Sequence, residues 1–121
     1  MALGITRIDH VQIGVPRSLE RECVAFYRGL LGLAEIAKPE ELPANGGAWF
    51  QIANVQLHIG LDDEASPPRK RHVGFLVTDL GLARAHAGAA GLVIEEQTSN
   101  DRAQRFFIRD PAGNRIEIGQ G

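Results

Sequence analysis

The sequence predicts an α+β fold built from two βαβββ modules, about residues 5–60 and 70–120 of a single 121-residue domain. Each half opens with an alternating run that begins with histidine, HVQIGV at 10–15 and HVGFLV at 72–77, a pattern typical of a half-buried strand. In each half a helical segment and further strand-like runs follow. A unit of about 50–60 residues buries too little apolar surface to be stable alone. The two modules must therefore pair, within one chain or between chains.

The elements of the first module follow in order. A strand over 8–15 ends at Pro16, and a helix follows with Ser18 as its N-cap and Gly32 just after its end. The one cysteine, Cys23, lies on the apolar face of this helix, so we expect it to be buried. The remaining elements are a strand (33–38), a loop rich in proline and glycine (39–47), and a hairpin (49–52 and 55–59) whose turn is Ala53-Asn54.

The second module repeats this order. Asp79 caps an alanine-rich helix that ends at Gly91. A strand (92–97), a polar loop (98–104) and a hairpin (105–109 and 114–118) around Asp110–Gly113 complete it. The two helices are expected on one face of the mixed sheet, packed against the apolar residues of the alternating strands.

Composition excludes several classes of protein. The 44% apolar and 23% charged residues are ordinary for a globular domain, and the net charge of −2 gives no basic surface for nucleic acid. No segment is apolar enough for a membrane span and the N-terminus lacks a signal-peptide pattern, so we expect a cytoplasmic protein with no membrane partner.

Three of the four histidines and one glutamate recur at equivalent places in the two modules. His10 and His58 stand 48 positions apart, and His72 and Glu117 stand 45 apart. All four alternate with apolar residues, so they share the strand face turned away from the helices. One such histidine is usually just a solvent-facing residue, but four recurring groups favour a site for a catalytic divalent metal. The ion (Zn, Ni, Mn, Co or Fe) stays open, and so does direct contact between His58 and the metal.

Six further residues are candidates for a substrate pocket beside the metal. Packing in the core is an equal alternative for the two aromatic residues, and arginine is more often a surface charge, although a pocket arginine would hold an anionic group. The loops 39–47 and 98–104 are the natural places for substrate selection. The six residues are Gln12, Trp49, Gln56, Phe107, Arg109 and Arg115.

Four segments of the chain carry a resemblance to a known family. They are IDHVQIGV (8–15), FYRGLLGL (26–33), RHVGFLVTDL (71–80) and FFIRDPAGNRIEI (106–118). Together they resemble the vicinal oxygen chelate superfamily of glyoxalase I, bleomycin-resistance proteins and extradiol dioxygenases. The resemblance implies a U-shaped mixed sheet around a divalent metal, with helices on the outer face.

The same resemblance implies roles for the recurring residues. His10, His72 and Glu117 match the common metal ligands, and His58 takes the fourth ligand position, where glyoxalase I carries a glutamate. In many members the site is built across a homodimer. The sequence leaves open whether this chain forms such a swapped dimer or a closed monomer.

These observations favour a metal-dependent lyase or isomerase of the glyoxalase I type. Its substrate would be a small molecule that chelates the metal through adjacent oxygens, with Glu117 as the catalytic base or with a metal-bound hydroxide in that role. Two alternatives remain: a non-catalytic drug- or metabolite-binding protein of the bleomycin-resistance type, and a small extradiol-type dioxygenase. The sequence does not specify the substrate.

Overall fold

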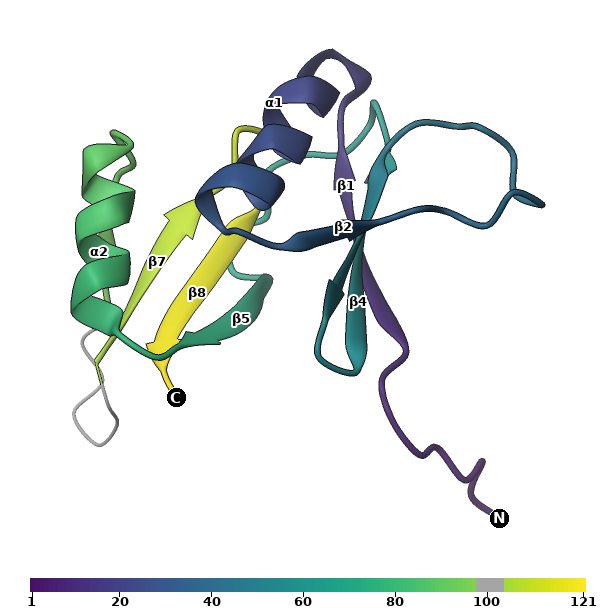
Figure 1. Ribbon diagram of the computed structural model, residues 1–121, viewed down its shortest axis with the longest axis horizontal. Helices are drawn as coiled ribbons and strands as arrows, with labels where there is room; N and C mark the ends of the chain where they lie inside the picture. Colours follow the sequence, from purple (N-terminus) through teal and green to yellow (C-terminus); the bar gives the residue numbers. More distant parts are fainter. Residues whose placement is uncertain (98–103) are drawn as a thin grey trace. The chain divides into compact units, whose positions relative to one another are not determined.

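The computed structural model describes residues 1–97 and 104–121, so most of the expected loop at 98–104 lies outside the described residues (Figure 1). The chain divides into two compact units, Met1–Asp63 and Glu64–Gly121. Each unit contains one four-stranded mixed sheet with the element order β-α-β-β-β. The predicted α+β class and the repeated module are confirmed.

The first unit contains four strands and one main helix. Its strands are β1 (His10–Val15), β2 (Ala34–Ile36), β3 (Ala48–Ile52) and β4 (Val55–Leu61), in the sheet order β1-β4-β3-β2. β1 is parallel to β4, whereas β3 is antiparallel to both β4 and β2. The helix α1 (Glu20–Ala25) follows a 3₁₀ turn (Arg17–Leu19) and continues as a π-helical turn (Phe26–Leu30).

The second unit repeats this topology strand for strand. Its elements are β5 (His72–Val77), α2 (Leu80–Ala89), β6 (Glu95–Glu96), β7 (Arg105–Arg109) and β8 (Arg115–Gln120). The sheet order is β5-β8-β7-β6, with β5 parallel to β8 and the other two pairs antiparallel. In both units, therefore, the first and last strands are hydrogen-bonded neighbours.

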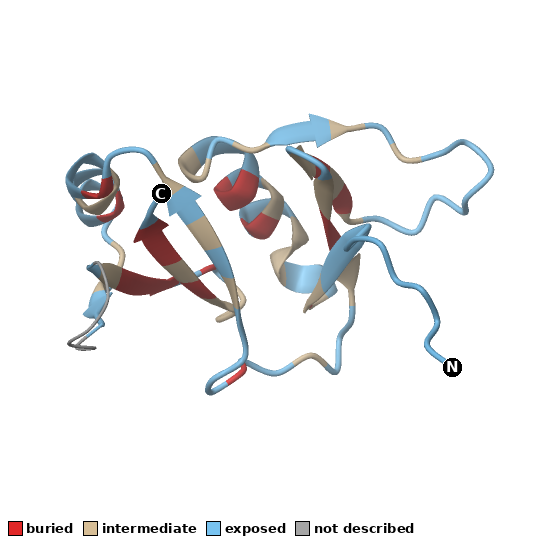
Figure 2. Cartoon of the chain, turned by 90° about the horizontal axis from the view of Figure 1, so that it is seen from below, coloured by how far each residue is buried: buried red, intermediate tan, exposed pale blue. Residues whose placement is uncertain are grey.

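Each sheet buries its apolar face. In the first unit Tyr27 is 1% exposed and its ring lies 6.2 Å from that of Phe50 on β3, while Cys23 is fully buried as expected. In the second unit the guanidinium of Arg84 on α2 covers the ring of Phe106 at 5.2 Å. Most buried residues lie on the inner strands of the two sheets, with fewer on the helices, whereas the N-terminal segment is exposed throughout (Figure 2). Among the described residues no helix is both long and apolar enough to cross a membrane.

The helix ends follow the predictions with one exception. The side chain of Asp79 accepts a hydrogen bond from the Leu82 amide and caps α2, and Gly32 and Gly91 follow their helices with φ of 67° and 79°. Ser18 is not an N-cap, because the 3₁₀ turn already begins after Pro16. The amide of Arg17 donates instead to a carboxylate oxygen from the end of the unit, Asp63 Oδ1, at 2.7 Å.

The hairpin turn of the first unit also differs in detail. Ala53, rather than Asn54, adopts the left-handed conformation, with φ of 50°. Its carbonyl accepts a hydrogen bond from Gln51 Nε2 at 2.8 Å. This contact offsets part of the strain that a non-glycine residue carries in this conformation.

Candidate functional site

The four predicted donor residues occupy the same strand register in both units. On β1, His10 pairs with position 56 of β4, two residues before His58. On β5, His72 pairs with position 115 of β8, two residues before Glu117. Residues two apart on a strand share a face. Each unit therefore presents one diagonal pair of donors on neighbouring parallel strands.

In the first unit the donors belong to a stack of three rings. The ring of Trp49 lies 3.9 Å from that of His58 at an interplanar angle of 2°, and the ring of His10 stacks on His58 at 4.3 Å and 11°. His58 is only 5% exposed, whereas 46% of the His10 side chain is accessible. The stack holds both imidazole planes in one orientation.

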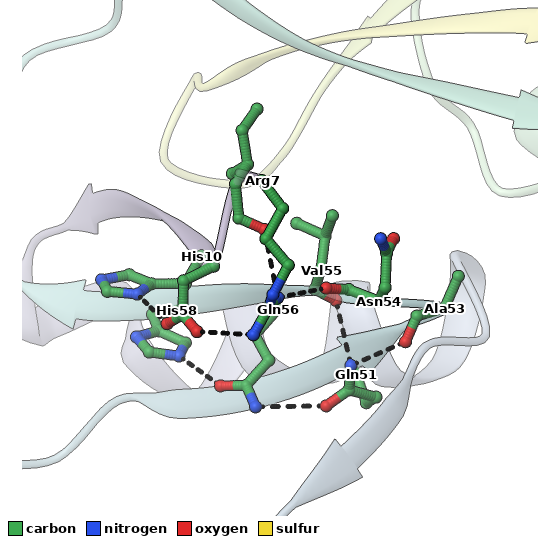
Figure 3. A network of polar contacts seen from close by, with 10 residues as sticks. Arg7, His10, Gln51, Ala53, Asn54, Val55, Gln56 and His58 are labelled. Atoms are coloured by element: carbon green, nitrogen blue, oxygen red, sulfur yellow. Dashed lines mark hydrogen bonds and ion pairs between the residues drawn. The ribbon is translucent and has the colours of Figure 1, made fainter. Parts of the chain in front are cut away.

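A chain of amide contacts fixes the tautomer of His58 (Figure 3). Gln51 Nε2 donates to the carbonyl of Ala53, so Gln51 Oε1 is the acceptor for Gln56 Nε2 at 3.1 Å. Gln56 Oε1 then lies 2.9 Å from His58 Nε2 and accepts its proton. In the neutral imidazole the other nitrogen, Nδ1, keeps its lone pair and can bind a metal.

The other two histidines are oriented in the same way. His10 Nδ1 donates to Asp9 Oδ2 at 2.8 Å, and His72 Nδ1 donates to the carbonyl of Lys70 at 2.9 Å. Each ring thus keeps the Nε2 lone pair free. A hydrogen bond from the nitrogen that does not bind the ion is the usual support of a metal-binding histidine. Asp9 lies immediately before the predicted donor, but the strand pattern alone did not indicate its role.

Electrostatics keep His58 neutral. Burial lowers the pKa of His58 below its usual 6.5, and the nearby charges of His10 and Lys38 lower it further, while Asp9 acts in the opposite direction. The hydrogen bond from His10 lowers the pKa of Asp9, which therefore stays ionised as the acceptor for that ring. His58 is therefore a neutral imidazole near neutral pH, the form that binds metal.

The lowered pKa of His58 predicts a pH-dependent stability for the metal-free protein. Between the folded pKa and 6.5 the unfolded chain binds more protons than the folded one. The free energy of unfolding should therefore fall as pH drops from 6.5 through the folded pKa of His58, and this contribution should level off below it. Urea denaturation at a series of pH values, followed by the emission of the sole tryptophan, Trp49, measures the effect.

Two variants test whether His58, rather than another histidine, causes this pH dependence of stability. His58→Gln should reduce the decline, because it removes the group that titrates. His86→Gln changes an exposed histidine on α2 and should leave the decline as in the parent protein. A full decline in His58→Gln would assign the effect to another group.

In the second unit the carboxylate of Glu117 lies between two cationic or potentially cationic groups. Its Oε2 is 3.8 Å from His72 Nε2 and 3.4 Å from Arg105 Nη1. The side chains of Glu117 and Arg105 are 16% and 23% exposed. Arg105 was not among the predicted site residues, although its place on the same face of β7 could have indicated it.

The predicted pocket residues of the second unit gather beside this pair. The guanidinium of Arg115 lies 3.6 Å above the ring of Phe107, and His72 meets that ring edge-on at 5.3 Å. Phe107, Arg109 and Arg115 line a cavity of about 320 Å³ together with residues 91–93, Glu95 and Ile108, whereas His72 is not part of its lining. Arg109 also donates to the carbonyls of Pro68 and Gly113 at 2.6 and 2.8 Å, so it holds the linker against the β7–β8 turn.

The predicted pocket residues of the first unit surround His58. Trp49 covers one face of its ring, and Gln56 fixes its tautomer, as described above. Gln12 is exposed and pairs with His58 across β1 and β4. A side chain at Gly60 would come within 2.6 Å of Gln12 Nε2, so this glycine leaves room for the Gln12 amide.

The donor set fits a divalent metal in its chemistry. Each unit supplies two donors on one face, three of the four are imidazoles with a defined free nitrogen, and the fourth is a carboxylate. No group of three or more His, Cys, Asp or Glu side chains within residues 1–97 and 104–121 could hold a metal by itself.

Comparisons with known proteins agree with this architecture. A protein from Bacillus anthracis assigned to the glyoxalase family is 36% identical, with a TM-score of 0.90 over 100% of this chain and 99% of that chain. Lactoylglutathione lyase from Agrobacterium tumefaciens shares the fold at 22% identity, with a TM-score of 0.76 over 97% and 95% of the two chains. The Arabidopsis thaliana protein Glyoxylase I 4 is 27% identical over 129 residues, which cover 96% of this chain and 71% of that protein.

The family itself follows from a match over nearly the whole sequence. Residues 7–118 match the Glyoxalase/Bleomycin resistance protein/Dioxygenase superfamily. This range includes all four predicted donors and the strands of both units, apart from the last two residues of β8. The chain therefore belongs to the glyoxalase/bleomycin resistance protein/dioxygenase superfamily.

Proposed function

We propose that the protein is a divalent-metal-dependent lyase or isomerase of the glyoxalase type. Its substrate is a small molecule that chelates the ion through two adjacent oxygens. The observation that carries the proposal is the repeated diagonal pair: each unit offers two donors on one face in the same register. Membership of the superfamily supports the same reading.

In this proposal His10, His58, His72 and Glu117 hold one divalent ion of the group Zn, Ni, Mn, Co and Fe. A bound divalent ion polarises the substrate oxygens and stabilises negative charge that develops on them, which contributes several kcal/mol. Glu117 is the one carboxylate among the four donors. It is therefore the group that we propose accepts and returns the substrate proton.

The proposed pocket residues surround these donors. Trp49 and Phe107 present apolar ring surface next to His58 and His72. Arg115 and Arg109 line the cavity beside Phe107 and supply positive charge there. The amide of Gln56 is occupied by His58 and Gln51, so we assign to it the orientation of His58.

Metal content tests this function. Purified protein, loaded with each ion in turn and then dialysed, should retain close to one ion per site in elemental analysis. Turnover of small 2-oxo and 2-hydroxy compounds should then depend on that ion. Loading without turnover but with tight ligand binding would favour a binding protein. Oxygen consumption with catechols under Fe(II) would favour a dioxygenase.

We further propose that the protein forms a homodimer whose metal sites combine the first-unit pair of one chain with the second-unit pair of the other. Neither His10→Ala nor Glu117→Ala alone should bind metal tightly. In a mixed dimer one site carries both substitutions and the other carries neither, so mixing the two variants should restore one intact site per heterodimer. Metal analysis of the separated heterodimer measures this. If mixing restores no metal, each site is built within one chain.

A further inference from the structure

Within the described part of the chain, Arg105 is the closest ion-pair partner of Glu117, the only carboxylate among the four proposed donors. Its Nη1 lies 3.4 Å from Glu117 Oε2, closer than His72 Nε2 at 3.8 Å. The pair connects β7 and β8 on the face that carries the donors. Because both side chains are mostly buried, solvent screens their charges less than at the surface.

The backbone of β8 leaves room for this arginine. Arg105 pairs with Gly119, and a Cβ at Gly119 would lie 2.9 Å from Arg105 Nη1. The absent side chain lets the guanidinium lie across β8 toward Glu117. Arg105 Nε is buried and has no hydrogen-bond partner in the part of the chain that the structure describes. The guanidinium thus has donor capacity beyond its contact with Glu117.

Arg105 alters the charge of the proposed site. A divalent ion held by three neutral imidazoles and one carboxylate carries one net positive charge, and the adjacent guanidinium adds a second. A neutral chelator would leave this charge uncompensated at a partly buried site. An anionic chelator would compensate it and could accept a charge-assisted hydrogen bond from the guanidinium.

We infer that Arg105 is a specificity-determining residue that selects substrates whose chelating oxygens carry negative charge, such as 2-oxo or 2-hydroxy carboxylates. This inference rests on the proposed metal-dependent function and names its substrate class. A hydrogen bond to a charged group stabilises binding by about 1.5–3 kcal/mol, which corresponds to roughly ten-fold or more in affinity. Neutral chelators would gain little from the same arginine.

Three isosteric probes test the inference: oxalate, oxamate and oxamide, which share adjacent oxygens but are a dianion, a monoanion and a neutral molecule. Calorimetric titration of the metal-saturated protein measures the affinity of each probe. Arg105→Gln should weaken the binding of oxalate by about ten-fold or more and the binding of oxamide by less than about two-fold. Arg105→Lys, which keeps the charge but loses the planar fork, should lie between the parent and Arg105→Gln.

Two further variants serve as controls. Arg84→Gln removes another arginine of the same unit, one that pairs with Glu96 on the helix side of the sheet, and should leave all three affinities unchanged. Gly119→Ala should displace the guanidinium without changing any charged group, and should reproduce part of the loss for oxalate. It keeps the inference testable if Arg105→Gln does not fold.

The outcomes separate this inference from the proposed function. A parent protein that retains no divalent metal would contradict the proposed function before any probe is added. A parent protein that retains metal, with Arg105→Gln weakening all three probes equally or none of them, would overturn the role of Arg105 alone. Metal content is measured again after each titration, so that loss of the ion to oxalate is not mistaken for weak binding.

Discussion

A Glu117→Ala variant is expected to lose tight binding of a divalent metal while it keeps the fold. Glu117 is the only anionic donor in the proposed set, and an ion held by three neutral imidazoles lacks the charge compensation that a carboxylate gives. Loss even of a supporting hydrogen bond to a metal ligand weakens metal affinity by roughly 10–100-fold. Removal of the ligand itself should exceed about 100-fold, as measured by calorimetry and by elemental analysis after dialysis.

The fold should survive because Glu117 lies on the polar face of β8 and is not part of the apolar core. The substitution leaves Arg105 without its carboxylate partner, so a loss of about 1–3 kcal/mol in unfolding free energy is expected. Glu96→Ala is the matched control, since it removes a carboxylate that pairs with Arg84 at 2.7 Å on the other face of the same sheet. Metal binding as tight in Glu117→Ala as in Glu96→Ala would remove Glu117 from the ligand set.

The largest effect on stability is expected for Gly47→Ala. Gly47 has φ of +79°, and a Cβ there would lie 2.0 Å from the carbonyl oxygen of Ile59. Backbone atoms of the adjacent strand cannot move aside as a flexible side chain can. Pairing of β3 with β4 begins at the next residue, and the Gly47 amide donates to Glu20 Oε2 at 2.7 Å. The substitution should reduce the free energy of unfolding by more than about 3 kcal/mol.

Gly91→Ala separates the conformational part of this effect from the clash. Gly91 has the same φ of +79°, but nothing lies within 4 Å of the position of its Cβ. Its substitution should reduce stability by about 1 kcal/mol, the usual penalty for a left-handed non-glycine residue. Urea denaturation of both variants, followed by circular dichroism, gives the comparison. Similar losses of unfolding free energy in the two variants would show that the Ile59 carbonyl moves away from the added Cβ at little energetic cost.

The alternating apolar pattern predicted the central strands well. The predicted strands at 72–77 and 105–109 match β5 and β7 residue for residue. The outer strands were predicted too long: 33–38 is reduced to Ala34–Ile36 and 92–97 to Glu95–Glu96. An edge strand has a hydrogen-bonded neighbour on one side only. Its length is therefore set by how many residues stay in contact with that neighbour, and the local sequence does not determine this number.

The sequence predicted which face of each sheet carries the candidate site residues, but not the contacts between their side chains. Strand periodicity placed the four donors on one face of each sheet, and the pairing of β1 with β4 and of β5 with β8 agrees. Whether all four donors bind one ion stays a prediction. The hydrogen bonds that orient the imidazoles were not predictable, because they depend on side-chain conformations and on the register of contacts such as that between Gln56 and His58. The place of Arg105 on the donor face of β7 could have been predicted, but its contact with Glu117 could not, because that contact is diagonal between strands and depends on their register.

The parallel pairing of the first and last strands affects how the donors come together during folding. His10 and His58 lie on strands that are neighbours in the sheet but far apart in the sequence, and the same holds for His72 and Glu117. Contacts of such long sequence separation form late and slow the folding reaction. A nascent or partly unfolded chain would have little affinity for the ion, so any ligand that binds these donors adds its binding free energy to the native state by mass action.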